Sequence, residues 1–193
     1  TGYAGTAILT KFKPLGVKYD LGIPKHDLDG RLLTLEFEKF YMVNVYIPHV
    51  GEDRDRHNYR VNEWDIDFRN YLIGLKSKKN VIVCGDFNVI RDPIDAWSDE
   101  AFKKLPDFHP KERGNFNKLL DSGFVDTFRQ LYPTDQKFTY WSYRYKGRER
   151  NKGWRMDYFL VNTEAFKNIE DSIINDVVTG SDHVPLELLY RIK

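Results

Sequence analysis

Residues 80–88 read NVIVCGDFN, an apolar run that ends in a glycine, an acid and an amide. A short apolar run bounded by turn residues predicts a buried strand followed by a loop. Asp86 and Asn88 stand two residues apart at this end. On an extended chain such residues point the same way, so their carboxylate and amide are expected to face one site. The alternative is a strand-end turn held by Asx hydrogen bonds.

The sequence on both sides of this run contains further strands. Leu33, Leu35 and Phe37 alternate with polar residues, which is typical of a half-buried strand. The same reasoning predicts strands over residues 7–12, 31–37, 41–47, 156–162, 172–178 and 185–192. Hairpins mixed with helices favour a layered α/β domain with mixed rather than purely parallel sheets.

Two segments between the predicted strands carry the apolar period of a helix. Residues 59–75 place four large apolar side chains on one stripe, and residues 110–122 are amphipathic as well. Gly123 follows the second segment, where a helix end favours a residue that tolerates positive φ. Residues 91–110 match no element, and long ordered loops in compact domains are often functional.

The composition indicates a folded chain but does not select a partner. The 193 residues are compatible with one domain over residues 1–193, and 41% of them are hydrophobic. Thirty basic and 29 acidic residues balance, so only local clustering of charge could indicate nucleic-acid binding. Cys84 is the single cysteine, which excludes a disulfide within the chain and favours a reducing compartment. No stretch approaches the length of a membrane span.

Two more strand ends carry titratable residues. Asp157 opens one predicted strand, where an acid is costly unless it is partnered or faces the surface. GSDHVPL, residues 180–186, places Asp182 and His183 directly before another strand. A nearby carboxylate stabilises the charged form of a histidine, which suits contact with a phosphate. A single Asp-His pair is more often structural, but three such strand ends together indicate a site.

Residues 141–155 combine cations with aromatic rings. The cations are Arg144, Lys146, Arg148, Arg150, Lys152 and Arg155, and the interleaved rings belong to Trp141, Tyr143, Tyr145 and Trp154. Cations neutralise phosphates and aromatic faces stack on bases, so this segment is a candidate nucleic-acid contact. The alternative is a solvated hairpin loop with its rings packed underneath. Tyr46, before Pro48 at a strand end, could also contact a phosphate, with core packing as the default alternative.

In their order and spacing, these motifs resemble the exonuclease III/AP endonuclease family of DNA repair nucleases. The matching stretches are GYAG, HDLDGRLLTLEF, VCGDFNV, DSGFVDTFRQLYP, FTYWSYR, NKGWRMDYFLV and GSDHVPL. The family belongs to the endonuclease/exonuclease/phosphatase superfamily. The resemblance therefore implies a DNase I-like four-layer α/β sandwich, with two mixed β-sheets flanked by helices.

The resemblance also implies roles for the residues at the strand ends. Asp86 is similar to the acid that activates or positions the attacking water, and Asn88 to the residue that orients that water and the phosphate. Tyr46 resembles the tyrosine at the scissile phosphate or its leaving group. Asp157 and His183 resemble an acid–imidazole pair with the imidazole on a phosphate oxygen, and Asp182 resembles a metal-site acid.

For DNA, the resemblance implies a pocket for a flipped-out abasic sugar and a wedge into the duplex. Tyr140, Arg144 and Trp154 match the positions that form them, and Tyr3 matches a position that contacts the DNA backbone. Within the basic and aromatic segment, Trp141, Arg148 and Lys152 complete the expected DNA contacts.

The implied reaction is Mg²⁺-assisted hydrolysis 5′ to an abasic site, with Mn²⁺ as a substitute metal. The resemblance adds 3′→5′ exonuclease and 3′-phosphodiesterase activity as further expectations. The implied substrate is double-stranded DNA with abasic sites or 3′ ends, and the implied state is a monomer without membrane association. The expected location is the cytoplasm of a prokaryote, or the nucleus if the source is eukaryotic.

Three departures from the family pattern leave alternatives open. The family begins with a strand that carries an Asn and then a Glu, the principal metal ligand, and the sequence lacks both, so we expect an N-terminally incomplete domain. His49 and Glu52 stand near positions where the family has an Asn and an Arg. The stretch IDAWSDEAF replaces a loop with phosphate-contacting Asn residues. The alternatives are a damaged-DNA binding module without turnover, and a phosphodiesterase of the same fold with another substrate.

Overall fold

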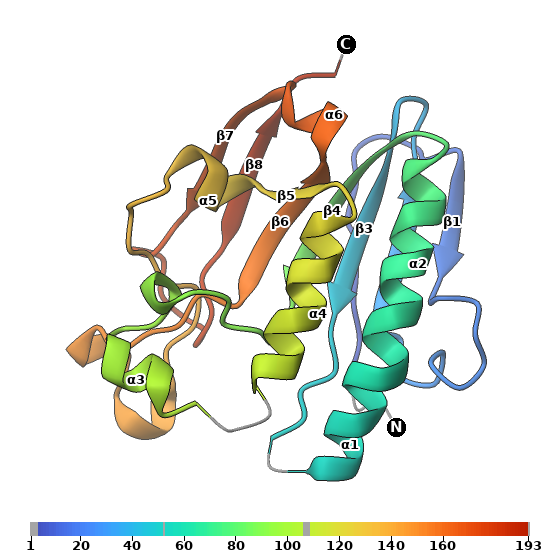
Figure 1. The fold of residues 1–193 in the computed structure, drawn as a ribbon. Helices are drawn as coiled ribbons and strands as arrows, with labels where there is room; N and C mark the ends of the chain where they lie inside the picture. Colours follow the sequence, from blue (N-terminus) through green and yellow to red (C-terminus); the bar gives the residue numbers. More distant parts are fainter. Residues whose placement is uncertain (1–3, 52, 106–108, 193) are drawn as a thin grey trace.

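A mixed sheet of six strands forms the centre of the molecule (Figure 1). The computed structural model describes residues 4–51, 53–105 and 109–192. The strands are β1 (Gly16–Tyr19), β2 (Leu32–Glu36), β3 (Phe40–Tyr46), β4 (Asn80–Asp86), β5 (Phe124–Asp126) and β6 (Asp157–Asn162), in the spatial order β1-β2-β3-β4-β6-β5. β3 and β4 run parallel, and the other neighbouring pairs are antiparallel. The predicted mixed character of the main sheet is confirmed.

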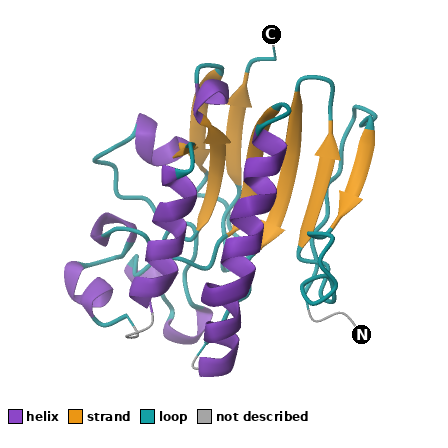
Figure 2. Cartoon of the chain, turned by 45° about the vertical axis from the view of Figure 1, so that its right-hand side comes forward, coloured by secondary structure: helices purple, strands orange, loops and turns teal. Residues whose placement is uncertain are grey.

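Two long helices cover one face of this sheet (Figures 1 and 2). The first begins with α1 (Arg54–Tyr59), continues through a π-helical segment (Arg60–Trp64) and ends with α2 (Asp65–Lys76). The second, α4, spans His109–Asp121. Both predicted helices are therefore confirmed. Gly123, just beyond α4, has φ +95°, the backbone conformation expected for a residue that ends a helix.

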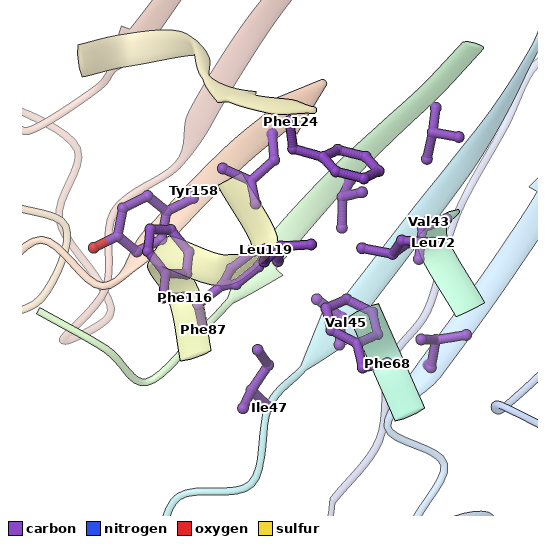
Figure 3. Close-up of a cluster of buried hydrophobic side chains, with 14 of the residues drawn as sticks. Val43, Val45, Ile47, Phe68, Leu72, Phe87, Phe116, Leu119, Phe124 and Tyr158 are labelled. Atoms are coloured by element: carbon purple, nitrogen blue, oxygen red, sulfur yellow. The ribbon is translucent and has the colours of Figure 1, made fainter. Parts of the chain in front are cut away.

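The main core lies between these helices and the sheet (Figure 3). Alternate residues of the strands point toward the helices because side chains alternate across a sheet. Val43 and Val83 are fully buried, and they join Phe68 and Phe116 from the helices in one cluster. This packing holds the ends of β3 and β4 in fixed register.

A two-stranded antiparallel sheet packs on part of the opposite face. It consists of β7 (Ile169–Ile174) and β8 (Leu186–Tyr190). Leu188 and Tyr190 pack there against a cluster that includes Ile82 and Val161. Within the described residues the layers are helices, six-stranded sheet and two-stranded sheet. The expectation of two mixed sheets in four layers is thus met only in part, since the second sheet is antiparallel and Leu189 on its outer side is 45% exposed.

The predicted strand over residues 7–12 is wrong. Those residues form no ladder, and the carbonyl of Ala7 accepts a hydrogen bond from the side chain of Asn44 instead. The edge of β2 that could have paired with them is occupied by β1. Leu9 and Phe12 remain largely exposed as a result.

The remaining differences concern short elements. The strand expected at 172–178 begins and ends earlier, because the chain turns after Ile174. The unassigned residues 91–110 contain a 3-10 turn (Pro93–Asp95) and α3 (Asp99–Lys103). The other short elements are α5 (Thr127–Leu131), α6 (Thr163–Phe166) and 3-10 turns at Tyr143–Tyr145 and Arg148–Arg150. Of the helices formed by described residues, none has both the length and the apolar character needed to cross a membrane.

Candidate active site

Three predicted site residues form one row across the sheet. The register pairs Tyr46 of β3 with Asp86 of β4, and Asp86 with Asp157 of β6. Residues opposite each other on neighbouring strands project to the same face, so the phenol and the two carboxylates share one face. This is the face that β7 and β8 cover farther along the strands. Strand pairing alone therefore brings these three groups together.

The backbone bends sharply at the end of β4. Gly85 has φ +137°, and a Cβ at this position would lie 1.9 Å from the carbonyl oxygen of Val45, so no side chain fits. Asn88 adopts a left-handed φ of +46°, and its N–H donates to the carboxylate of Asp86 at 2.8 Å. The expectation that an extended chain aligns Asp86 with Asn88 is wrong. An Asx-type turn joins them instead, and the side-chain amide of Asn88 donates to the carbonyl of Ile47 at 2.9 Å.

The loop before β8 adds an imidazole to the row. Nδ1 of His183 lies 2.8 Å from Oδ2 of Asp157, as expected for an acid–imidazole pair. The position of Asp157 is itself fixed by Thr139, whose buried hydroxyl accepts hydrogen bonds from the N–H groups of Met156 and Asp157 at 3.0 and 3.1 Å. The pair is thus held from both the strand and the loop.

The electrostatics of the row shift two pKa values. Burial and the neighbouring charge of Asp157 raise the pKa of Asp86 to about 7, although the hydrogen bond from Asn88 and the charge of His183 oppose the shift. Burial disfavours the charged imidazole of His183, but the hydrogen bond and charge of Asp157 outweigh it and raise the pKa of His183. Near neutral pH, Asp86 can therefore exchange a proton while His183 tends to carry one.

The same residues can hold a divalent cation. Ligand atoms of Asp86, Asp157 and His183 all lie within 4.8 Å of one another, a separation compatible with one shared ion. The two carboxylates suit Mg²⁺ and Mn²⁺. Asp182, the predicted metal-site acid, is outside this trio. Its backbone carbonyl accepts from the N–H of Trp141 at 2.9 Å.

Tyr140 and Trp154 border the site. Tyr140 forms isolated bridges to both Trp154 and His183, and its ring lies 4.9 Å from the imidazole of His183 between centroids. Both residues are partly exposed. The ring of Tyr140 thus lies beside the acid–imidazole pair, where a wall of a substrate pocket is expected, and the backbone of Trp154 pairs with that of Tyr140.

Two of the residues expected to contact DNA have other partners. Trp141 is only 4% exposed and packs edge-on against Phe138 at 6.1 Å. Arg148 lies over the ring of Trp141 at 5.0 Å and donates to the carbonyls of Asp176 and Val178. The ring of Trp141 is therefore part of a buried cluster with Phe138 and Val184, and its DNA contact stays a prediction. For this ring and this guanidinium, the alternative of rings packed under a loop describes the geometry better.

Another cation of the basic segment, Arg155, is fully buried. Arg155 is 1% exposed and bonds Asp126 with both terminal nitrogens, at 3.1 and 2.7 Å. Its Nε bonds Asp95 at 2.7 Å, and Arg129 reaches the same carboxylate. Arg155 therefore joins three segments of the fold and is not available to neutralise phosphates.

The other predicted contacts lie at the surface. Arg144 is exposed beside the ring of Tyr145, and Lys152 is exposed with its ammonium 4.4 Å from the ring of Trp97. His49 is also exposed. Tyr3 and Glu52 lie outside the described residues.

The structure adds supporting residues that the sequence analysis missed. The guanidinium of Arg31 lies 5.1 Å from the ring of Tyr46 and donates to the Tyr46 carbonyl at 3.4 Å. Thr139, described above, was hidden inside the stretch FTYW. Arg60, inside a predicted helix, also reaches the end of β4. Each is a single polar residue whose supporting contacts come from other segments, so no sequence motif indicated its role.

Comparison with known proteins gives consistent matches. A model of the Endonuclease/Exonuclease/phosphatase family matches residues 1–183. The chain is 42% identical to the zebrafish (Danio rerio) DNA repair nuclease APEX1, over 99% of this chain but 62% of that protein. It is also 42% identical to an exodeoxyribonuclease of Bacillus subtilis, over 99% of this chain and 76% of the relative. An AP endonuclease structure from Leishmania major superimposes with a TM-score of 0.82 at 30% identity, over 92% of this chain and 61% of the other.

Proposed function

The chain belongs to the endonuclease/exonuclease/phosphatase family, and within it to the exonuclease III/AP endonuclease group, and from this membership we propose a specific reaction. The protein is a Mg²⁺-dependent DNA repair nuclease that hydrolyses the phosphodiester 5′ to an abasic site. The proposal includes 3′→5′ exonuclease and 3′-phosphodiesterase activity at the same centre. The chain spans 62% of the length of the zebrafish relative, so the activity of the whole protein is likewise a proposal.

One observation carries the proposal, the row of Tyr46, Asp86 and Asp157 with His183 bonded to its last member. A site that only binds DNA needs cations and rings, whereas it has no need for a buried carboxyl group with a pKa raised to about 7. Such a group is suited to take a proton from water near neutral pH. The row therefore favours hydrolysis over binding without turnover.

Each residue of the row has a distinct proposed role. Asp86 accepts the proton of the attacking water, and the turn that contains Asn88 fixes its carboxylate. His183, oriented by Asp157, donates a hydrogen bond to a phosphate oxygen and offsets charge that develops there. The hydroxyl of Tyr46 lies on the same face and contacts the phosphate or the leaving oxygen.

A divalent cation fits the carboxylates of Asp86 and Asp157. When bound, it supplies charge stabilisation for the phosphate and its leaving oxygen. Asp182 remains a proposed participant, because its charge acts on His183 from the adjoining position. Removal of the metal is expected to abolish turnover and to leave the acid–imidazole pair in place.

The proposed DNA contacts are the exposed groups around the row. Tyr140 and Trp154 line the space for an extruded sugar, and Arg144 and Lys152 contact the DNA backbone or wedge into it. Tyr3 is proposed to contact the backbone, on the family resemblance alone. These cations and rings favour DNA over a small phosphodiester as the substrate.

The deciding experiment compares wild type with Asp86→Asn on a duplex that contains one abasic-site analogue, with and without Mg²⁺. Asp121→Asn, an exposed acid at the end of α4, is the matched control. Metal-dependent incision that is lost in Asp86→Asn and kept in the control supports the proposal. Binding without incision in the wild type would indicate a damaged-DNA binding module, and cleavage of small phosphodiesters alone would indicate another substrate.

A further inference from the structure

Arg60 is a buried cation that the proposed chemistry does not use. It is 2% exposed and lies in the π-helical segment that joins α1 to α2. A buried guanidinium carries five donors that need acceptors, and an unsatisfied one is costly. The groups that accept hydrogen bonds from Arg60 therefore indicate which parts of the chain it holds in place.

Most of these acceptors are backbone carbonyls at the ends of β3 and β4. Arg60 donates to the carbonyls of Phe87 and Asn88 at 2.9 Å each, and to the carbonyl of Pro48 at 3.3 Å. Phe87 and Asn88 follow Asp86 directly, and Pro48 lies two residues after Tyr46. One guanidinium thus bonds the two chain segments that leave the catalytic row.

The same two segments are also bonded to each other. The side-chain amide of Asn88 donates to the carbonyl of Ile47 at 2.9 Å, and the N–H of Ile47 donates to the carbonyl of Asp86 at 2.9 Å. Asn88 has a left-handed backbone, a conformation that Asn adopts more readily than other non-glycine residues, and these hydrogen bonds stabilise it. Arg60 lies on the side of this turn that faces the helices.

Two acids hold the guanidinium in its place. The Nη1 of Arg60 lies 3.1 Å from Oε1 of Glu112 on α4, and its Nε lies 3.7 Å from Oδ1 of Asp65. Glu112 is in turn 2.9 Å from Nδ1 of His109. The wider π-helical turn, a feature frequent at functional sites, carries Arg60, whose Nη1 is hydrogen-bonded to Glu112 and whose Nε has no hydrogen-bond partner among the described residues.

We propose that Arg60 is a positioning residue for the nuclease reaction, whose fork of hydrogen bonds fixes the backbone after Tyr46 and after Asp86. Arg60 acts through that backbone and contacts neither phosphate nor metal. The expected effect of Arg60 on the reaction rate rests on the proposed function. Its expected effect on the backbone rests on the geometry alone. A lysine keeps the charge but not the planar fork, so it cannot serve all of these acceptors at once.

The test compares wild type with Arg60→Lys and with the control Arg69→Lys, another arginine of the same helical rod. Hydrogen–deuterium exchange is followed for residues 47–51 and 86–90, and incision of an abasic duplex at saturating Mg²⁺ gives kcat and KM. We expect faster exchange in both segments and a kcat lower by on the order of 10²-fold, with KM nearly unchanged. Arg69→Lys is expected to change neither.

A second variant covers the case in which Arg60→Lys does not fold. Arg60→Gln combined with Glu112→Gln removes both charges of this buried pair, and the remaining acid, Asp65, keeps its hydrogen bond from Asn115. Its exchange in the two segments is expected to be faster, while exchange in the rest of the sheet stays as in the wild type. The exchange measurement does not depend on activity, so an inactive wild type would refute the proposed function and still leave the positioning role testable. Unchanged exchange in either folded variant, or an unchanged kcat in an active one, would overturn the proposal.

Discussion

The row of groups at the ends of β3, β4 and β6 differs from the basic and aromatic segment of residues 141–155 in how its side chains are placed. In the row, strand register puts Tyr46, Asp86 and Asp157 on one face. In the segment, cations of the same short stretch differ in burial: Arg144 is exposed, whereas Arg155 is 1% exposed. Strand register determines which residues share a face of the sheet, whereas the residues of a loop follow no such regular placement.

The two regions also differ in what holds them. Hydrogen bonds from Thr139 and the pair with His183 fix Asp157 on two sides. The segment is held from beneath by Trp141 and by Arg148, which caps the carbonyls of another loop. Substitutions in the row should therefore change rate, and substitutions in the segment should separate into stability effects and DNA-affinity effects.

The largest expected effect is on catalysis, from His183→Ala. Loss of a positioned charged donor should lower kcat by about 10²- to 10⁴-fold. Single-turnover incision with saturating enzyme measures the chemical step, and circular dichroism confirms the fold. A variant within about threefold of wild type, on the same scale, would mean that the row is not the catalytic centre.

Trp141→Ala tests the segment as a structural element. The ring is 4% exposed in a cluster with Phe138 and Val184, so its removal should cost about 3–5 kcal/mol of the free energy of unfolding. Urea denaturation gives this value. An unchanged free energy of unfolding together with weaker DNA binding would show that Trp141 contacts DNA. The segment would then not differ from the row in the way described above.

The raised pKa of Asp86 predicts a pH dependence of stability. Its folded-state pKa of about 7 is above its ordinary value of 3.8, so the folded state binds the extra proton between these values. Metal-free protein should then lose stability as pH rises from about 4 to about 7, by a few kcal/mol at most. Asp86→Asn should remove this part of the slope. Equal slopes for both proteins in urea titrations at several pH values would show that Asp86 has an ordinary pKa.

Arg144→Ala should give the smallest effect. Its side chain is exposed and touches only the ring of Tyr145 in the described part of the chain, so stability should change by less than about 0.5 kcal/mol. DNA binding should weaken, and the slope of log affinity against log salt should fall by about 1 if the residue contacts a phosphate. A salt titration of binding to an abasic duplex measures this, with Lys167→Ala, an exposed cation outside residues 141–155, as the control.

The sequence predicted the elements with a strong period and missed those that depend on distant partners. The strand through Cys84 and the helix through Phe68 were visible because their own residues carry the pattern. The residues expected as a strand at 7–12 form no ladder, and β1 pairs with the edge of β2 instead. β1 itself was missed because its four residues, GVKY, are mostly exposed and carry no apolar run.

The candidate site was predictable in its members and not in its geometry. Asp86, Asp157 and His183 were chosen from three separate motifs, and the structure brings them within 4.8 Å. Of the two interpretations offered for Asp86 and Asn88, the Asx turn is confirmed and the shared extended direction is wrong, since Asn88 adopts a positive φ at which Asn is enriched. Arg60 and Arg155 were not distinguishable from surface cations, since burial of a charge depends on partners that come from other segments.

The parallel pairing of β3 with β4 has a consequence for how activity arises during folding. Tyr46 and Asp86 become neighbours only after the long helical crossover between their strands has folded back, and Asp157 joins them from a much later part of the chain. Pairings of this kind carry a high loop-closure entropy and form late. Refolding chains should therefore regain helical signal well before they regain the ability to cut. If the row is the catalytic centre proposed above, a partly folded molecule in which these strands are not yet paired should not cleave DNA.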